Sequence, residues 1–144
     1  MAEALCRQHI QNTEDTNLQD WCIGSAGCWA YPDMPATEKA VIAVDKYNTD
    51  LSNHSARSVS ASLLEDYRLV LCMEDSHVSF IKRHFPEAAD RVFLFSEMIN
   101  EKFEVDDPVG KSQSAYDGSA NAIYSIIKNG WKKIVVLSFD RFAC

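Results

Sequence analysis

Two short apolar runs, residues 68–73 and 91–95, constrain the fold of this chain most strongly. Each run is continuous rather than alternating, which is typical of a strand covered on both faces. Between them, the spacing of apolar residues predicts a helix that is capped by Asp75 and ends near Pro86. A strand, a helix and a second strand in this order predict a parallel α/β sheet with helices on both faces.

The rest of the chain extends the alternation of strands and helices. In its first half, the sequence predicts a helix over residues 1–11, a short strand that runs into a small-residue turn over 21–27, a helix capped by Thr37, and a helical turn opened by the capping box Ser62 to Glu65. In its second half, it predicts a helix over 113–128 that stops at Asn129-Gly130, and a strand or a helical tail over 133–139.

Composition narrows the class of protein. The chain has 144 residues, of which 47% are hydrophobic, so residues 1–144 are interpreted as a single domain. A net charge of −7 argues against a nucleic-acid partner and against an anionic membrane. No signal peptide is visible and no apolar run approaches a membrane span. Five scattered cysteines without a C-x-x-C predict free thiols in a reducing cytoplasm, with no disulfide framework, metal site or cofactor.

Asp107 is the candidate for chemistry. Pro108 fixes its own φ and keeps Asp107 out of the α region, so the carboxylate stands on a stiff turn. Ligands of parallel α/β sheets bind beyond the carboxyl ends of the strands, and the loops expected there are 25–29, 50–57, 73–77 and 96–110. The alternative is that Asp107 serves only as a turn residue, because Asp before Pro is common turn chemistry.

Five short segments occur in a characteristic order and spacing. They are Met-Ala-Glu-Ala-Leu at 1–5, Ser-Ala-Gly at 25–27, Asp-Leu-Ser-x-His-x-Ala-Arg at 50–57, Leu-Cys-Met at 71–73 and Asp-Pro at 107–108. Together they resemble the low-molecular-weight protein tyrosine phosphatase family, including its bacterial protein-arginine phosphatase branch. The resemblance covers roughly residues 1–134, with one departure after Asp-Pro, where the family often has an aromatic residue and this chain has Val109.

The resemblance implies a fold and a set of roles. The expected fold has three layers, with a four-stranded parallel sheet and flanking helices. A cysteine thiolate in a loop of Cys, five residues, then Arg-Ser-Pro attacks phosphorus, and Asp107 is the implied general acid. Ser25 and His54 match positions that brace the phosphate loop, and Trp29 lies close to the aromatic wall of the pocket. The alternatives are a surface histidine at His54 and a core residue at Trp29.

The family's loop would end immediately before Met1, so the first strand and the nucleophile are missing from these residues. Three interpretations fit: a gene start upstream of Met1, a truncated and inactive relative, or replacement of the first strand by residues 134–139. In the last case Ser138 stands where a cysteine should, residues 139–144 lie near the phosphate site, and Arg141 and Cys144 do not restore the Cys-to-Arg spacing.

The sequence therefore predicts a phosphatase for phosphotyrosine or phosphoarginine in phosphorylated protein substrates, acting through a cysteinyl-phosphate. Residues 1–144 alone are expected to be inactive. The alternative is a catalytically dead, phosphatase-like binding domain or a non-functional fragment. The sequence leaves open the preference between tyrosine and arginine, the substrate protein and the oligomeric state.

Overall fold

The computed structural model describes residues 1–13 and 21–139. As far as they are described, the residues form two compact units. The first unit comprises Met1–Ser58 and Asp107–Ser125, and the second comprises Val59–Asp106 and the chain from Ile126 onward. The interpretation of residues 1–144 as one domain stays a prediction.

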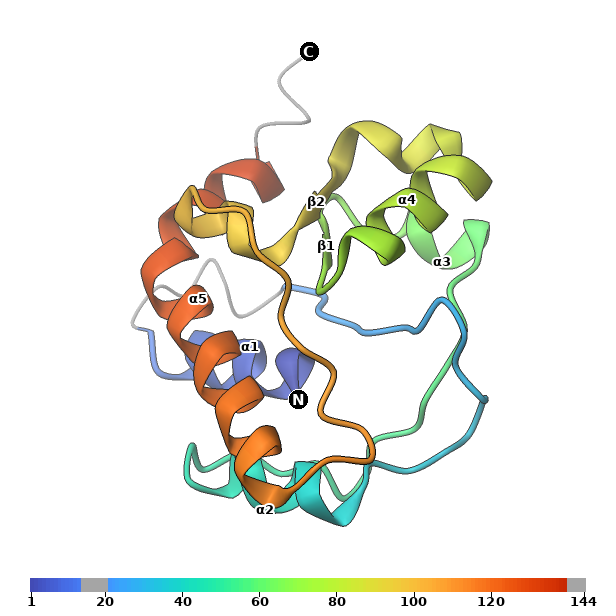
Figure 1. The fold of residues 1–144 in the computed structure, drawn as a ribbon. Helices are drawn as coiled ribbons and strands as arrows, with labels where there is room; N and C mark the ends of the chain where they lie inside the picture. The colour runs from blue at the N-terminus through green and yellow to red at the C-terminus, as the bar shows by residue number, and fades with distance from the viewer. Residues whose placement is uncertain (14–20, 140–144) are drawn as a thin grey trace. The chain divides into compact units, whose positions relative to one another are not determined.

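The second unit contains the predicted strand–helix–strand arrangement. Strands β1 (Val70–Cys72) and β2 (Val92–Leu94) are parallel, with Leu71 opposite Phe93. Helix α4 (Asp75–His84) and the 3₁₀ helix η2 (Pro86–Arg91) connect them, and α4 packs against both strands (Figure 1). The parallel α/β class is confirmed, although β1 and β2 are the only strands found in the described residues. The Cys72 thiol is buried in β1, as predicted.

Two predicted helix caps are displaced by a residue or two. Helix α3 (Ala61–Glu65) is capped by Ser60, whose Oγ accepts the Leu63 N–H at 3.1 Å, and not by Ser62. Asp75 does not cap α4 but is its first residue, and its N–H donates to the carboxylate of Glu104 at 2.9 Å. The acceptor at the N-terminus of α4 is therefore a carboxylate from a distant segment, and not the Asp75 side chain that the local spacing had predicted as the cap.

The buried Ser96 ties the 3₁₀ helix η3 (Phe95–Ile99) to the segment that follows it. Its hydroxyl donates to the Phe103 carbonyl at 2.6 Å and accepts the Phe103 N–H at 2.9 Å. Two residues further on, the Val105 N–H donates to the Met73 carbonyl at 2.9 Å, just beyond β1. The segment that leads toward Asp107 is therefore held at 103 and again at 105.

We expect Ser96→Ala to lower the free energy of unfolding by about 1–3 kcal/mol, because both backbone groups of Phe103 lose this partner. Urea denaturation measures the change. The control is Ser138→Ala, which removes a hydroxyl that donates to the Ile134 carbonyl one turn earlier in its own helix and should cost well under half as much. Equal losses in the two variants would contradict the role given to Ser96.

The first unit is helical. Helix α1 (Ala2–Gln11) and helix α2 (Glu38–Asp45) appear as predicted, with the Thr37 side chain capping α2. Residues 21–27 do not form the predicted strand: in the described part of the chain they make one isolated bridge, Gly27 to Ser58. Apolar residues at strand spacing become a strand only when a neighbour pairs with them along their length.

Helix α5 (Gln113–Phe139) corrects two predictions. The helix does not stop at Asn129-Gly130 as predicted. Residues 134–139 are also helical, so the interpretation of that segment as a replacement strand is wrong. The buried isoleucines Ile126, Ile127 and Ile134 continue the helical period through the predicted stop. Arg141 and Cys144 lie outside the described residues.

Gly130 is in α5 because of a close approach and not because of a helix end. A Cβ at this position would lie 2.8 Å from the Met98 Cβ and 2.9 Å from the Met98 carbonyl oxygen. Glycine is the residue that permits such contact between two backbones. The glycine that was interpreted as a helix stop is therefore needed for the close packing of α5 against Met98.

Candidate active site

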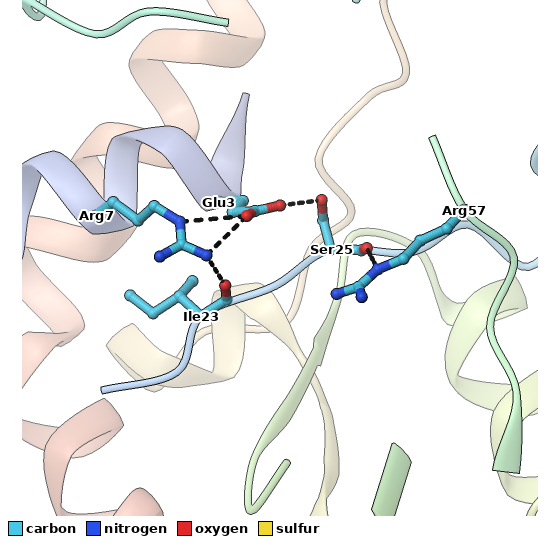
Figure 2. Close-up of polar contacts among 5 residues, drawn as sticks. All are labelled: Glu3, Arg7, Ile23, Ser25 and Arg57. Atoms are coloured by element: carbon cyan, nitrogen blue, oxygen red, sulfur yellow. Dashed lines mark hydrogen bonds and ion pairs between the residues drawn. The ribbon is translucent and has the colours of Figure 1, made fainter. Parts of the chain in front are cut away.

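Ser25 is at the centre of a polar network in the first unit (Figure 2). Its hydroxyl donates to Glu3 Oε2 at 2.5 Å, and its backbone carbonyl accepts from Arg57 Nε at 2.9 Å. Glu3 Oε1 accepts from Arg7 Nη2 at 3.0 Å and from Arg7 Nε at 3.2 Å. Arg7 also donates to the Ile23 carbonyl. The segment from Ile23 to Ser25 is thus attached to α1 at two points.

Glu3 is the charged centre of this network. Burial raises the pKa of its carboxyl, but the hydrogen bonds from Ser25 and Arg7, the positive charge of Arg7 and the electrostatic influence of the His54 side chain outweigh burial and lower the pKa overall. The carboxylate is therefore ionised at neutral pH and acts only as an acceptor. Ser25 and His54, the two predicted supports of the phosphate loop, both interact with this one side chain.

Sequence reasoning missed Glu3, Arg7 and Arg57 as members of the site. One signal was present, because Glu3 and Arg7 are four residues apart on a predicted helix, the spacing of a stabilising ion pair. No sequence signal pointed to the bonds from Arg7 to Ile23 and from Arg57 to Ser25, since these join residues 16 and 32 positions apart.

His54 lies half-buried in the loop after α2, where its N–H donates to the Leu51 carbonyl at 3.1 Å. Trp29 is 62% exposed, so its interpretation as a core residue is wrong. An exposed indole supplies the kind of aromatic surface that the predicted wall requires.

Asp107 is fixed by its own turn. Its Oδ1 accepts the Val109 N–H at 2.9 Å, Pro108 is buried, and Gly110 adopts a φ of +78°. Within residues 1–13 and 21–139, Oδ2 has no hydrogen-bond partner. The exposed carboxylate is therefore held by one oxygen while the other remains open to solvent, which suits a group that transfers a proton.

Two cysteines of the first unit, Cys6 and Cys28, have surroundings that disfavour an activated nucleophile. Burial raises the pKa of the Cys6 thiol to about 11, and burial also raises the pKa of Cys28. A nucleophilic cysteine needs a lowered pKa. None of the five cysteines is followed six residues later by an arginine. Among the described residues, no group of three or more His, Cys, Asp or Glu side chains is arranged to hold a metal.

No helix in the described part of the chain combines the length and apolar character needed to span a bilayer.

Solved structures define the class of protein. A low molecular weight protein tyrosine phosphatase from T. tengcongensis is similar, with a TM-score of 0.83 and 29% identity over 92% of this chain and 88% of that one. A mutant of the YwlE arginine phosphatase, with a phosphorylated active-site serine, has a TM-score of 0.82 and 29% identity over 93% and 85% of the two chains. The fold is that of the α/β phosphatases.

Sequence comparison identifies the family. The profile of the low molecular weight phosphotyrosine protein phosphatases matches residues 1–136. A probable low molecular weight protein-tyrosine-phosphatase, AmsI of Erwinia amylovora, is 32% identical over 113 residues, which cover 78% of this chain and 75% of AmsI. Wzb of Salmonella typhi is 32% identical over 106 residues, 74% of this chain and 68% of Wzb. The chain belongs to the low molecular weight protein-tyrosine-phosphatase family, whose members act on phosphorylated proteins.

Proposed function

We propose that this protein hydrolyses phosphotyrosine in proteins through a cysteinyl-phosphate, with Asp107 as general acid. The observation that supports the proposal is the Asp107 turn, where Val109 fixes Oδ1 and leaves Oδ2 open. A thiolate attacks phosphorus, the P–S bond forms as the P–O bond to the leaving group breaks, and Asp107 gives its proton to the leaving oxygen. The Asp107 carboxylate then takes a proton from water, whose oxygen attacks phosphorus and releases the thiolate.

The nucleophile is proposed to come from a loop of Cys, five residues, then Arg-Ser-Pro, joined directly ahead of Met1. Residues 1–144 alone are proposed to be inactive, because they contain no Cys-to-Arg pair at this spacing and the pKa values of Cys6 and Cys28 are raised. These same observations favour the second candidate function, a phosphatase-like binding domain without catalysis.

Trp29, Ser25 and His54 have supporting roles in this proposal. The exposed Trp29 forms an aromatic wall against which a phosphotyrosine ring stacks, while Ser25 and His54 brace the phosphate loop. Phosphoarginine is the alternative substrate, favoured by the likeness to YwlE. A guanidinium group also stacks on indole, so Trp29 is compatible with both substrates.

Turnover of p-nitrophenyl phosphate tests the proposal in two proteins. The first is residues 1–144, and the second carries a strand and the Cys-x5-Arg-Ser-Pro loop ahead of Met1, here termed the loop-bearing chain. We expect no turnover by the first protein and turnover by the second, lost when the loop cysteine is replaced by serine. Turnover by residues 1–144 that disappears in Asp107→Asn but survives in Ser138→Ala would indicate another nucleophile. An inactive loop-bearing chain that is folded would favour the binding domain.

A further inference from the structure

The network around Ser25 determines in which direction its hydroxyl can form hydrogen bonds. The Glu3 carboxylate has both oxygens engaged, Oε1 with the Arg7 guanidinium and Oε2 with Ser25 Oγ (Figure 2). Because an ionised carboxylate accepts hydrogen bonds and cannot donate one, the short contact of 2.5 Å requires Ser25 to be the donor.

A serine hydroxyl has one proton and two lone pairs. Once the proton of Ser25 points at Glu3, the oxygen presents only lone pairs to any other group. It can then accept an N–H, but it cannot donate to a phosphate oxygen. Arg57 Nε donates to the backbone carbonyl of Ser25 at 2.9 Å. Both the side chain and the backbone of Ser25 are therefore restrained by hydrogen bonds.

A carboxylate beside a phosphate site carries an electrostatic cost, because it repels the phosphate dianion. Arg7 offsets that charge with a two-nitrogen contact at 3.0 and 3.2 Å and also holds the Ile23 carbonyl. The guanidinium therefore neutralises Glu3 and fixes the approach of the Ser25 segment with one side chain.

We propose that Glu3, held by Arg7, is a positioning residue that fixes Ser25 as a hydrogen-bond acceptor for a backbone N–H of the phosphate loop. The inference rests on the proposed function, which places Ser25 against that loop. It excludes Ser25 as a direct donor to the substrate. It also gives Glu3 a role that does not require contact with substrate.

The first arm of the test uses residues 1–144 and follows the Glu3 carboxyl by ¹³C NMR as the pH is lowered. We expect a Glu3 pKa below its ordinary value, raised in Ser25→Ala and in Arg7→Met, and restored when Ser25 is replaced by threonine, which keeps the hydroxyl. Ser52→Ala is the control: it removes a hydroxyl bonded to Asp50 at 2.7 Å and should raise the pKa of Asp50 while leaving Glu3 unchanged. A Glu3 pKa that Ser25→Ala does not move would overturn the inference.

The second arm measures kcat and KM in the loop-bearing chain. Glu3→Gln puts an amide, which can donate, beside Ser25 Oγ, so we expect kcat to fall about 10- to 100-fold, the factor that corresponds to the loss of one hydrogen bond to a charged group. The kcat of Ser25→Ala should fall by a similar factor. The kcat of the double variant should fall no further, because the two substitutions break the same interaction. The inference would be overturned if the losses in kcat of the two single variants multiplied in the double variant, or if Glu3→Gln left kcat unchanged. If the loop-bearing chain is inactive while Glu3 titrates as expected, the proposed function fails and the Glu3–Ser25 interaction stands.

Discussion

Replacing Asp107 by asparagine should lower kcat of the loop-bearing chain about 10²- to 10⁴-fold and leave its thermal stability unchanged. The amide oxygen of asparagine can still accept the Val109 N–H, so the turn is preserved, while the proton for the leaving oxygen is lost. Steady-state kinetics and thermal unfolding of the same samples separate the two effects.

The dependence on the leaving group makes this prediction specific to proton transfer. A phenolate leaves less readily than a p-nitrophenolate and needs protonation more, so the loss in Asp107→Asn should be larger with phenyl phosphate than with p-nitrophenyl phosphate. The adjacent Asp106→Asn is the control, because it removes the same charge one residue earlier and should change kcat by less than about threefold. Equal losses with both substrates would argue that Asp107 acts through charge or structure and not as a general acid.

Replacing Gly130 by alanine should lower the free energy of unfolding by about 1–3 kcal/mol, although alanine is the better helix former. The new methyl group would lie 2.8 Å from the Met98 Cβ and 2.9 to 3.0 Å from the Met98 carbonyl group. Those carbonyl atoms belong to the backbone of η3, so relief of the clash requires the helix or η3 to move.

The control for this prediction is in the same helix. Gly118 is exposed, and a Cβ there meets nothing within 4 Å, so Gly118→Ala should raise the free energy of unfolding by about 0.5–1 kcal/mol. Chemical denaturation of both variants should therefore give shifts of opposite sign. A stabilised Gly130→Ala would show that α5 and η3 are not in the described contact.

Much of the architecture of the second unit could be predicted from the sequence. The continuous apolar character of Val70–Cys72 and Val92–Leu94 indicated buried parallel strands, and helical spacing indicated the helix between them. Both are local patterns, and burial on two faces is sufficient to specify them. The Asp107 turn was predictable for the same reason, because Pro108 and Gly110 act on neighbouring backbone angles.

The errors occurred where a local signal competed with a long-range contact. Asn129-Gly130 is typical of a helix end, but buried isoleucines on both sides of it and the contact with Met98 keep α5 continuous to Phe139. Residues 21–27 have strand-like composition, yet the described residues give them one bridge only. Composition states what a segment can form, and the available partners decide which form is stable.

The sequence by itself determined the parallel α/β class, the family and the position of Asp107, because these depend on periodicity and on motifs in register. Only the tertiary structure decided the path of the last helix and the surroundings of Ser25. Glu3, Arg7 and Arg57 reach the Ile23–Ser25 segment from positions 16 to 32 residues away. Hydrogen bonds across such separations depend on how the chain folds back on itself, and no local pattern encodes them.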